Sequence, residues 1–143
     1  MPLERLRELN QHLLAVPDGF AVHRKLEPPR ERRRHVFDDL DARTVDWATA
    51  EELAFASILA DGTPIGLTGE DVERGTFSHR HSVVYEANSG RRFTPLQNLP
   101  EARASFEVRN SPHSENAAVG FEYGYNIQAP ERLVVWEAQY GDF

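Results

Sequence analysis

The chain carries, at residues 111–125, the stretch SPHSENAAVGFEYGY, which has the pattern of a tightly packed helix. Pro112 suits the first helical position, and the serine before it can cap the exposed backbone amides. Alanine and glycine leave one side of this helix narrow, while Phe121 and Tyr125 recur four residues apart. The stretch therefore predicts a helix that begins at Pro112, carries Glu115 in its first turn and is approached closely by another element.

Glu115 can be interpreted in two ways from its position alone. A carboxylate in the first turn of a helix ordinarily complements the helix dipole, a contribution of roughly 0.3 to 1 kcal/mol. A carboxyl group held beside tightly packed turns could also serve proton chemistry at a binding site. The spacing of the stretch leaves both interpretations open.

Four short runs outside this helix have strand character and are separated by turn residues. They span residues 64–67, 82–85, 105–108 and 133–136. The expected helix lies between the last two runs, and a strand–helix–strand unit has the long crossover that parallel strands require. We therefore predict an α/β fold whose sheet is mostly parallel and flanked by helices.

The N-terminal third is expected to be helical and then irregular. Apolar residues recur in steps of three and four before Pro17, which predicts a helix with one apolar stripe formed by Leu3, Leu6, Leu9, Leu13 and Val16. Residues 21–44 are proline-punctuated and highly charged, and we interpret them as a linker with one short helix over residues 32–40.

A compact region is expected to follow this linker. Asp46 can cap a helix that starts at Trp47 and ends at Asp61, with a small-residue face made by Ala50, Leu53, Ala54, Ser57 and Ile58. The chain is therefore predicted to divide into a helical lead-in with a charged linker, residues 1–45, and the N-terminal part of an α/β domain, residues 46–143.

Composition fits one domain with a core of modest size, since the 143 residues are 40% hydrophobic and 27% charged. A formal net charge of -7 argues against nucleic acid or an anionic membrane as partner. The local basic cluster is interpreted as a solvated linker or helix face and consists of Arg30, Arg32, Arg33 and Arg34. Cysteine is absent, the longest apolar run (residues 53–60) is too short to span a bilayer, and a cytoplasmic location is expected.

His79 and His81 raise an alternative that involves a metal. Histidines two apart on a strand project from the same face, and Glu86 follows at a spacing similar to the metal motif of small β-barrel cupins. Cupins are almost entirely strand, however, whereas several helical segments are expected here, and His113 is the only later histidine. We therefore favour polar or interface packing for the two histidines and expect no metal ligands in this chain.

Three long stretches resemble, in the same order, the thiamine-diphosphate-dependent decarboxylating component of 2-oxoglutarate dehydrogenase. They are residues 67–81 (LTGEDVERGTFSHRH), residues 111–125 and residues 136–143 (WEAQYGDF). The resemblance extends more weakly over residues 3–17 and 46–60. Members of this family are several times longer, so the chain resembles the lead-in and first part of their transketolase-like pyrimidine-binding domain, without their diphosphate-binding domain.

This resemblance implies decarboxylation of 2-oxoglutarate with thiamine diphosphate and magnesium, followed by transfer of the succinyl unit to a lipoyl group. The lipoyl group belongs to a dihydrolipoyl succinyltransferase component, and the family works as a homodimer with the cofactor between subunits. The magnesium and diphosphate ligands match no part of this chain. The resemblance therefore implies that the 143 residues are inactive by themselves.

The resemblance also implies roles for particular residues. Glu115 matches the glutamate that hydrogen-bonds the pyrimidine ring nitrogen of the cofactor, and burial against Phe121 would keep its proton available near neutral pH. An aromatic ring stacks on the pyrimidine in this family, and the C-terminal stretch offers Phe143 first and Tyr140 second. Residues 69–71 follow an expected strand, so they would form a wall of the site.

Two positions depart from the family pattern. Gly66 stands where a larger, often charged residue is common, and Asn116 stands where a second glutamate or a small residue is common. Neither departure affects Glu115 itself, so the thiamine assignment holds, while another 2-oxo acid such as 2-oxoadipate stays open as the substrate. A stand-alone, non-catalytic binding or assembly module with the same fold is the alternative from a different functional class.

Overall fold

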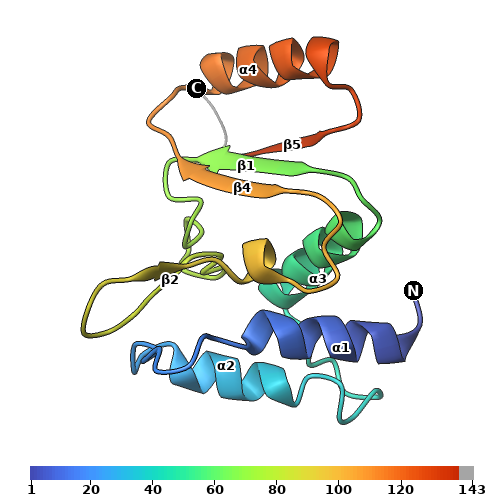
Figure 1. The fold of residues 1–143 in the computed structure, drawn as a ribbon, viewed down its shortest axis with the longest axis vertical. Coiled ribbons are helices and arrows are strands. Elements are labelled where there is room, and N and C mark those ends of the chain that lie inside the picture. Colours follow the sequence, from blue (N-terminus) through green and yellow to red (C-terminus); the bar gives the residue numbers. More distant parts are fainter. Residues whose placement is uncertain (139–143) are drawn as a thin grey trace.

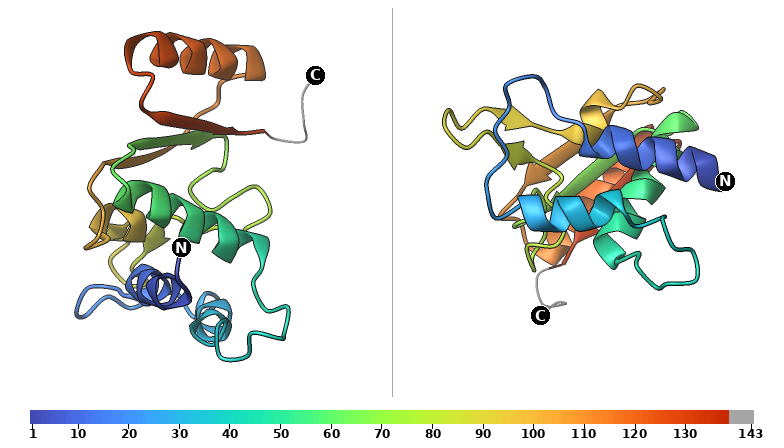
Figure 2. Two further views of the ribbon diagram at one scale, coloured as in Figure 1. Left: turned by 90° about the vertical axis from the view of Figure 1, so that its right-hand side faces the viewer. Right: turned by 90° about the horizontal axis from the view of Figure 1, so that it is seen from below.

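The computed structural model describes residues 1–138, which form a layered α/β arrangement. Helix α4 (Glu115–Gln128) covers one face of a three-stranded sheet, and helix α3 (Trp47–Ala60) covers the other (Figure 1). Helices α1 (Leu3–Leu14) and α2 (Glu27–Arg34) lie beyond α3, on the side away from the sheet (Figure 2). The predicted helical N-terminal segment is therefore confirmed.

All three strands of the main sheet run parallel. Strand β1 (Ile65–Gly69) lies in the centre, between β4 (Phe106–Asn110) and β5 (Leu133–Glu137). The chain leaves β4, passes through α4 and returns on the far side of β1, so the helix supplies the long crossover that parallel pairing requires. The predicted α/β class and mostly parallel sheet are confirmed.

Helix α3 lies between two layers, and this position decides which of its side chains are buried. Its start is as predicted, because the Asp46 side chain accepts a hydrogen bond from the Thr49 N–H at 2.8 Å. The predicted small-residue face was wrong in part, since Ala50 and Ala54 are exposed. The sheet on one side and α1 on the other require larger apolar groups, and the buried residues include Leu53, Phe55, Ala56 and Leu59.

Helix α1 joins the same core, whereas α2 has no buried residue. Leu9 and Leu13 of the predicted stripe are buried and pack in one apolar cluster with residues of α3 and the sheet. Helix α2 spans Glu27–Arg34, earlier than the predicted short helix over residues 32–40, because Pro28 and its neighbour occupy the first turn, where a missing amide donor costs nothing. The division of the chain at residue 45 stays a prediction.

A small antiparallel hairpin lies outside the main sheet. It pairs β2 (Val84–Tyr85) with β3 (Arg92–Phe93), and the 3₁₀ helix η1 (Pro95–Asn98) then leads toward β4. The strand predicted over residues 82–85 is thus confirmed only for Val84–Tyr85, and it belongs to the hairpin. Residues 70–83, hereafter the histidine loop, join β1 to this hairpin.

Helix α4 differs from its prediction in start and packing. It begins at Glu115, three residues after Pro112, and its N-cap residue Ser114 makes no side-chain capping hydrogen bond. The expected close approach was also wrong within residues 1–138: a Cβ at Gly120 or Gly124 would meet nothing within 4 Å. Only Ala118 of this helix is buried, and a cavity of about 480 Å³ separates α4 from the sheet.

Candidate functional site

The three parallel strands end at one edge of the sheet, hereafter the carboxyl edge. Their last residues are Gly69, Asn110 and Glu137, which the strand register places side by side. The Ser111 N–H donates to the Gly69 carbonyl oxygen at 2.8 Å, so the start of the β4–α4 connection is fastened to the end of β1. In open α/β sheets this edge is where ligands bind.

Glu115 lies near this edge as the first residue of α4. Its side chain is half-buried, and its carboxylate has no hydrogen-bond or ion-pair partner among residues 1–138. Phe121, which was expected to bury it, is 53% exposed and instead packs its ring against Tyr125 with 5.3 Å between ring centroids. The described part of the chain therefore leaves this carboxyl group available to a ligand.

The histidine loop follows β1 at the same edge and is compact. Arg74 ties it internally, because its guanidinium donates to the carbonyl oxygens of Gly75 and Thr76 at 2.9 and 3.0 Å and pairs with Asp71 at 2.7 Å. Gly75 has φ +81°, and a Cβ there would lie 2.5 Å from Cε1 of His79. The His79 ring thus packs directly on glycine backbone, and a side chain at position 75 would strain the backbone and displace the ring.

Two residues of the histidine loop hold strained backbone. Ser78 and His81 have φ values of 54° and 50°, in the left-handed region that residues with a side chain rarely adopt. Such strain persists only where surrounding contacts impose it, and it is concentrated at functional sites. Burial, together with the nearby charge of Arg74, lowers the pKa of the half-buried His81 ring and favours its neutral form.

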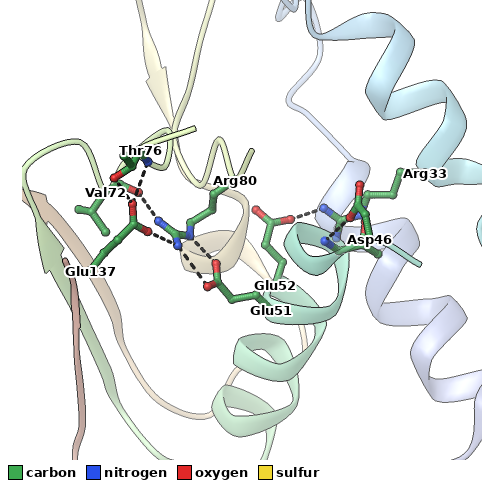
Figure 3. Close-up of polar contacts among 9 residues, drawn as sticks. Arg33, Asp46, Glu51, Glu52, Val72, Thr76, Arg80 and Glu137 are labelled. Atoms are coloured by element: carbon green, nitrogen blue, oxygen red, sulfur yellow. Dashed lines mark hydrogen bonds and ion pairs between the residues drawn. The ribbon is translucent and has the colours of Figure 1, made fainter. Parts of the chain in front are cut away.

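Arg80 anchors the histidine loop to the rest of the molecule (Figure 3). Its buried guanidinium pairs with both carboxylate oxygens of Glu51 on α3, with Nη2 to Oε2 at 3.1 Å, and with Oε2 of Glu137 on β5. It also donates from Nη1 to the Val72 carbonyl oxygen at 3.0 Å. Sequence reasoning missed this cluster, because its members are far apart in the chain and no local pattern joins them.

Glu137 also binds the histidine loop through Thr76. Its Oε1 accepts from the Thr76 N–H at 2.8 Å and from the Thr76 hydroxyl at 2.9 Å. Burial opposes ionisation of this carboxyl group, but the hydrogen bonds from Thr76 and the charge of Arg80 lower the pKa of Glu137 below its ordinary value. The end of β5 and the histidine loop are therefore joined by charged, hydrogen-bonded contacts.

The alternative metal site at His79, His81 and Glu86 was wrong. The two histidines lie in a loop and not on a strand, and the fold is not a barrel. The Glu86 carboxylate instead accepts hydrogen bonds from the backbone N–H groups of Asn88 and Ser89, at 3.2 and 2.6 Å. Within residues 1–138, no cluster of three or more histidine or carboxylate side chains could hold a metal ion.

Two larger cavities adjoin the histidine loop. One of about 530 Å³ extends toward α1, α2 and α3, and one of about 800 Å³ extends toward the hairpin. His79 and His81 line both. Glu115 lines neither of them, nor the cavity under α4, so the structure places it on the same edge as the histidines but not in a shared pocket. Phe143 and Tyr140 lie outside the described residues, and their stacking role stays a prediction.

Comparisons with known proteins point in one direction. The family model described as the transketolase pyrimidine binding domain matches residues 43–143. The 2-oxoglutarate dehydrogenase E1 components of Staphylococcus aureus strains N315 and JH9 are each 54% identical to this chain over 140 residues, 98% of its length. The chain spans only 15% of the length of these relatives. No helix within residues 1–138 is both long and apolar enough to cross a membrane.

Proposed function

Because the chain belongs to the transketolase pyrimidine-binding domain family, we propose that it is the lead-in and first part of that domain in a thiamine-diphosphate-dependent 2-oxoglutarate dehydrogenase. The observation that carries this proposal is the position of Glu115. It combines a half-buried carboxylate, a helix start near the carboxyl edge, and the lack of any partner within residues 1–138. A group with these properties can take a ligand nitrogen as its partner.

The residues present fit the pyrimidine half of the cofactor. When bound, thiamine diphosphate supplies the electron sink that the decarboxylation of a 2-oxo acid requires. Glu115 would hold a proton and donate it in a hydrogen bond to the pyrimidine ring nitrogen. Phe143, with Tyr140 second, would supply the ring that stacks on the pyrimidine.

The other requirements of the reaction would be met by segments outside these 143 residues and by partner proteins. Magnesium and the diphosphate group would be held by segments that this chain does not contain, so we expect the 143 residues alone to release no carbon dioxide above background. The proposed partners are a second copy of the protein and the lipoyl-bearing dihydrolipoyl succinyltransferase component. The net charge of -7 supports a role without nucleic acid, and a cytoplasmic location stays a prediction.

The test is turnover of 2-oxoglutarate by the full-length protein with thiamine diphosphate and magnesium. Glu115→Gln keeps the size of the side chain but removes the acidic proton, and we expect it to lower kcat at least ~100-fold, the scale of a lost proton-transfer partner. Glu122→Gln is the matched control on the same helix, where Glu122 accepts a hydrogen bond from the Asn126 side-chain amide at 2.8 Å.

Circular dichroism should show both variants folded. A Glu115→Gln protein with near-native turnover would return this residue to the role of an ordinary first-turn carboxylate. A wild-type protein that neither binds thiamine diphosphate nor turns over 2-oxoglutarate would favour the stand-alone binding module instead.

A further inference from the structure

We propose that Arg80 is a positioning residue, which fixes the histidine loop and presents His79 and His81 at the carboxyl edge. The inference rests on the proposed function in one respect, namely that this edge borders the reaction site. The Arg80 side chain is only 3% exposed, and its guanidinium is occupied by Glu51, Glu137 and the Val72 carbonyl oxygen. Its effect must therefore pass through the loop that it holds.

The contacts of Arg80 connect three parts of the fold. Nε and Nη2 of the guanidinium bind Glu51 on α3, Nη2 also binds Glu137 at the end of β5, and Nη1 binds the Val72 carbonyl oxygen near the start of the loop (Figure 3). The backbone closes the loop as well, because the Arg80 and His81 N–H groups both donate to the Arg74 carbonyl oxygen, at 3.0 and 3.1 Å. Arg80 thus joins the loop to α3 and to β5, while backbone hydrogen bonds close the loop itself.

Energetics favour a geometric role for this cluster. Burying a guanidinium with carboxylates costs desolvation, so such a cluster commonly adds no more stability than packed apolar side chains of the same volume. The charged cluster instead fixes the orientation of the Arg80 side chain relative to its partners. A guanidinium donates hydrogen bonds in a fixed planar geometry that a lysine or an apolar side chain cannot reproduce. This orientation also affects the two histidines, because Arg80 lies directly between them in the sequence.

Backbone strain near Arg80 supports the same conclusion. Ser78 and His81 adopt left-handed φ values of 54° and 50°, which their own side chains disfavour. A loop with such residues relaxes unless contacts outside it hold it in place. Arg80 makes those contacts, and Glu137 adds a second fastening through the N–H and hydroxyl of Thr76.

Arg80→Lys and Glu137→Gln in the full-length protein test the inference, with Arg132→Lys as matched control. Arg132 is also largely covered, with its side chain 13% exposed and Nη2 bound to Glu107 at 3.1 Å, but it precedes β5 at the opposite edge of the sheet. We expect hydrogen exchange of the amides in the histidine loop to accelerate roughly tenfold or more in the first two variants and to stay unchanged in the control.

Steady-state kinetics distinguish a positioning role of Arg80 from a general loss of structure. For Arg80→Lys we expect kcat with 2-oxoglutarate to fall roughly tenfold or more, a size typical of a small displacement in the wall of a reaction site. The half-saturating concentration of thiamine diphosphate should change less than about threefold, because Glu115 on α4 makes no contact with the Arg80 cluster. A fall in kcat accompanied by an equally large rise in the half-saturating concentration of thiamine diphosphate would indicate a merely structural role and overturn the inference.

Other outcomes are equally decisive. Unchanged exchange in the histidine loop overturns the inference, and so does faster exchange with unchanged kcat. If Arg80→Lys fails to fold, Glu51→Gln tests the same contact at a side chain that is already 34% exposed. A wild-type protein without any turnover would refute the proposed function, while the exchange comparison would still decide whether Arg80 holds the loop.

Discussion

A Cβ at Gly69 would lie 2.7 Å from the backbone oxygen of Glu137 and 3.2 Å from its Cβ. The last residue of β1 therefore meets the last residue of β5 at a separation that only glycine permits. The histidine loop begins at the next residue, and Glu137 holds that loop through Thr76. Close strand contact and loop attachment thus coincide at one point of the carboxyl edge.

Alanine substitutions at the two glycines of β1 should have opposite effects. Gly69→Ala must push backbone aside, which we expect to lower the free energy of unfolding by roughly 1 to 3 kcal/mol. Gly66→Ala meets nothing within 4 Å and borders the cavity beneath α4, so it should raise stability by about 0.5 to 1 kcal/mol. Urea unfolding of both variants measures the difference. Equal values for the two would contradict the proposed contact.

The pair between Arg33 and Glu52 should behave as a coupled unit. Arg33 Nη1 pairs with the buried Glu52 carboxylate, and its Nε donates to Asn10 Oδ1 at 2.8 Å, which joins α1, α2 and α3. We expect Arg33→Met or Glu52→Leu alone to cost roughly 3 to 5 kcal/mol, and the double variant to cost clearly less than either. Additive losses in this cycle would disprove the coupling.

The same pair has a pH signature. Burial raises the pKa of Glu52 from its ordinary 4.5, and Arg33 opposes that rise. An acid with a raised pKa in the folded state loses stability as the pH increases from 4.5 through the folded value. Arg33→Met removes the opposing charge, so its stability deficit should grow with pH. A deficit that is constant with pH would count against this account.

The carboxyl group of Glu86 should titrate far below the usual range. Hydrogen bonds from the side chain and backbone of Ser89, with a further one from the Asn88 N–H, lower the pKa of Glu86 from 4.5 to about 2. The turn is therefore stabilised above pH 4.5, and that stabilisation is lost as the pH falls through about 2. Carbon-detected NMR titration measures the midpoint, and Ser89→Ala should move it upward. Ser111→Ala, in a different loop, should leave it unchanged.

Helix α4 should mediate association of the 143-residue chain. Val119, Tyr123 and Ile127 are spaced four apart, so they share one side of the helix, and they are 57%, 69% and 59% exposed. We expect light scattering at micromolar concentration to show a dimer or larger species, and Val119→Ser with Ile127→Ser to shift it to monomer. Leu40→Ser, at a residue 62% exposed after α2, is the control. A monomeric wild-type chain would contradict this prediction, since the apolar side of α4 would then stay exposed to solvent.

Local sequence signals were enough for the class of the fold. The strands around β1, β4 and β5, the Asp46 cap of α3 and the parallel crossover all follow from periodicity, turn residues and capping chemistry, which act over a few residues. The matches around the histidine loop and α4 were also sufficient to identify the family, since they are long and in a fixed order. Glu115 as a candidate came from the sequence as well.

Contacts between distant segments were decided only by the tertiary structure. The pairing of Arg80 with Glu51 and Glu137 requires α3, the histidine loop and β5 to be assembled, and nothing in the sequence near any one of them signals the other two. The buried side of α3 was mispredicted because neighbouring layers, and not local propensity, determine which side chains face the core. Local chemistry determines the helices and strands of this protein, whereas ion pairs between distant elements, such as Arg80 with Glu51 and Glu137, form only once the fold is assembled.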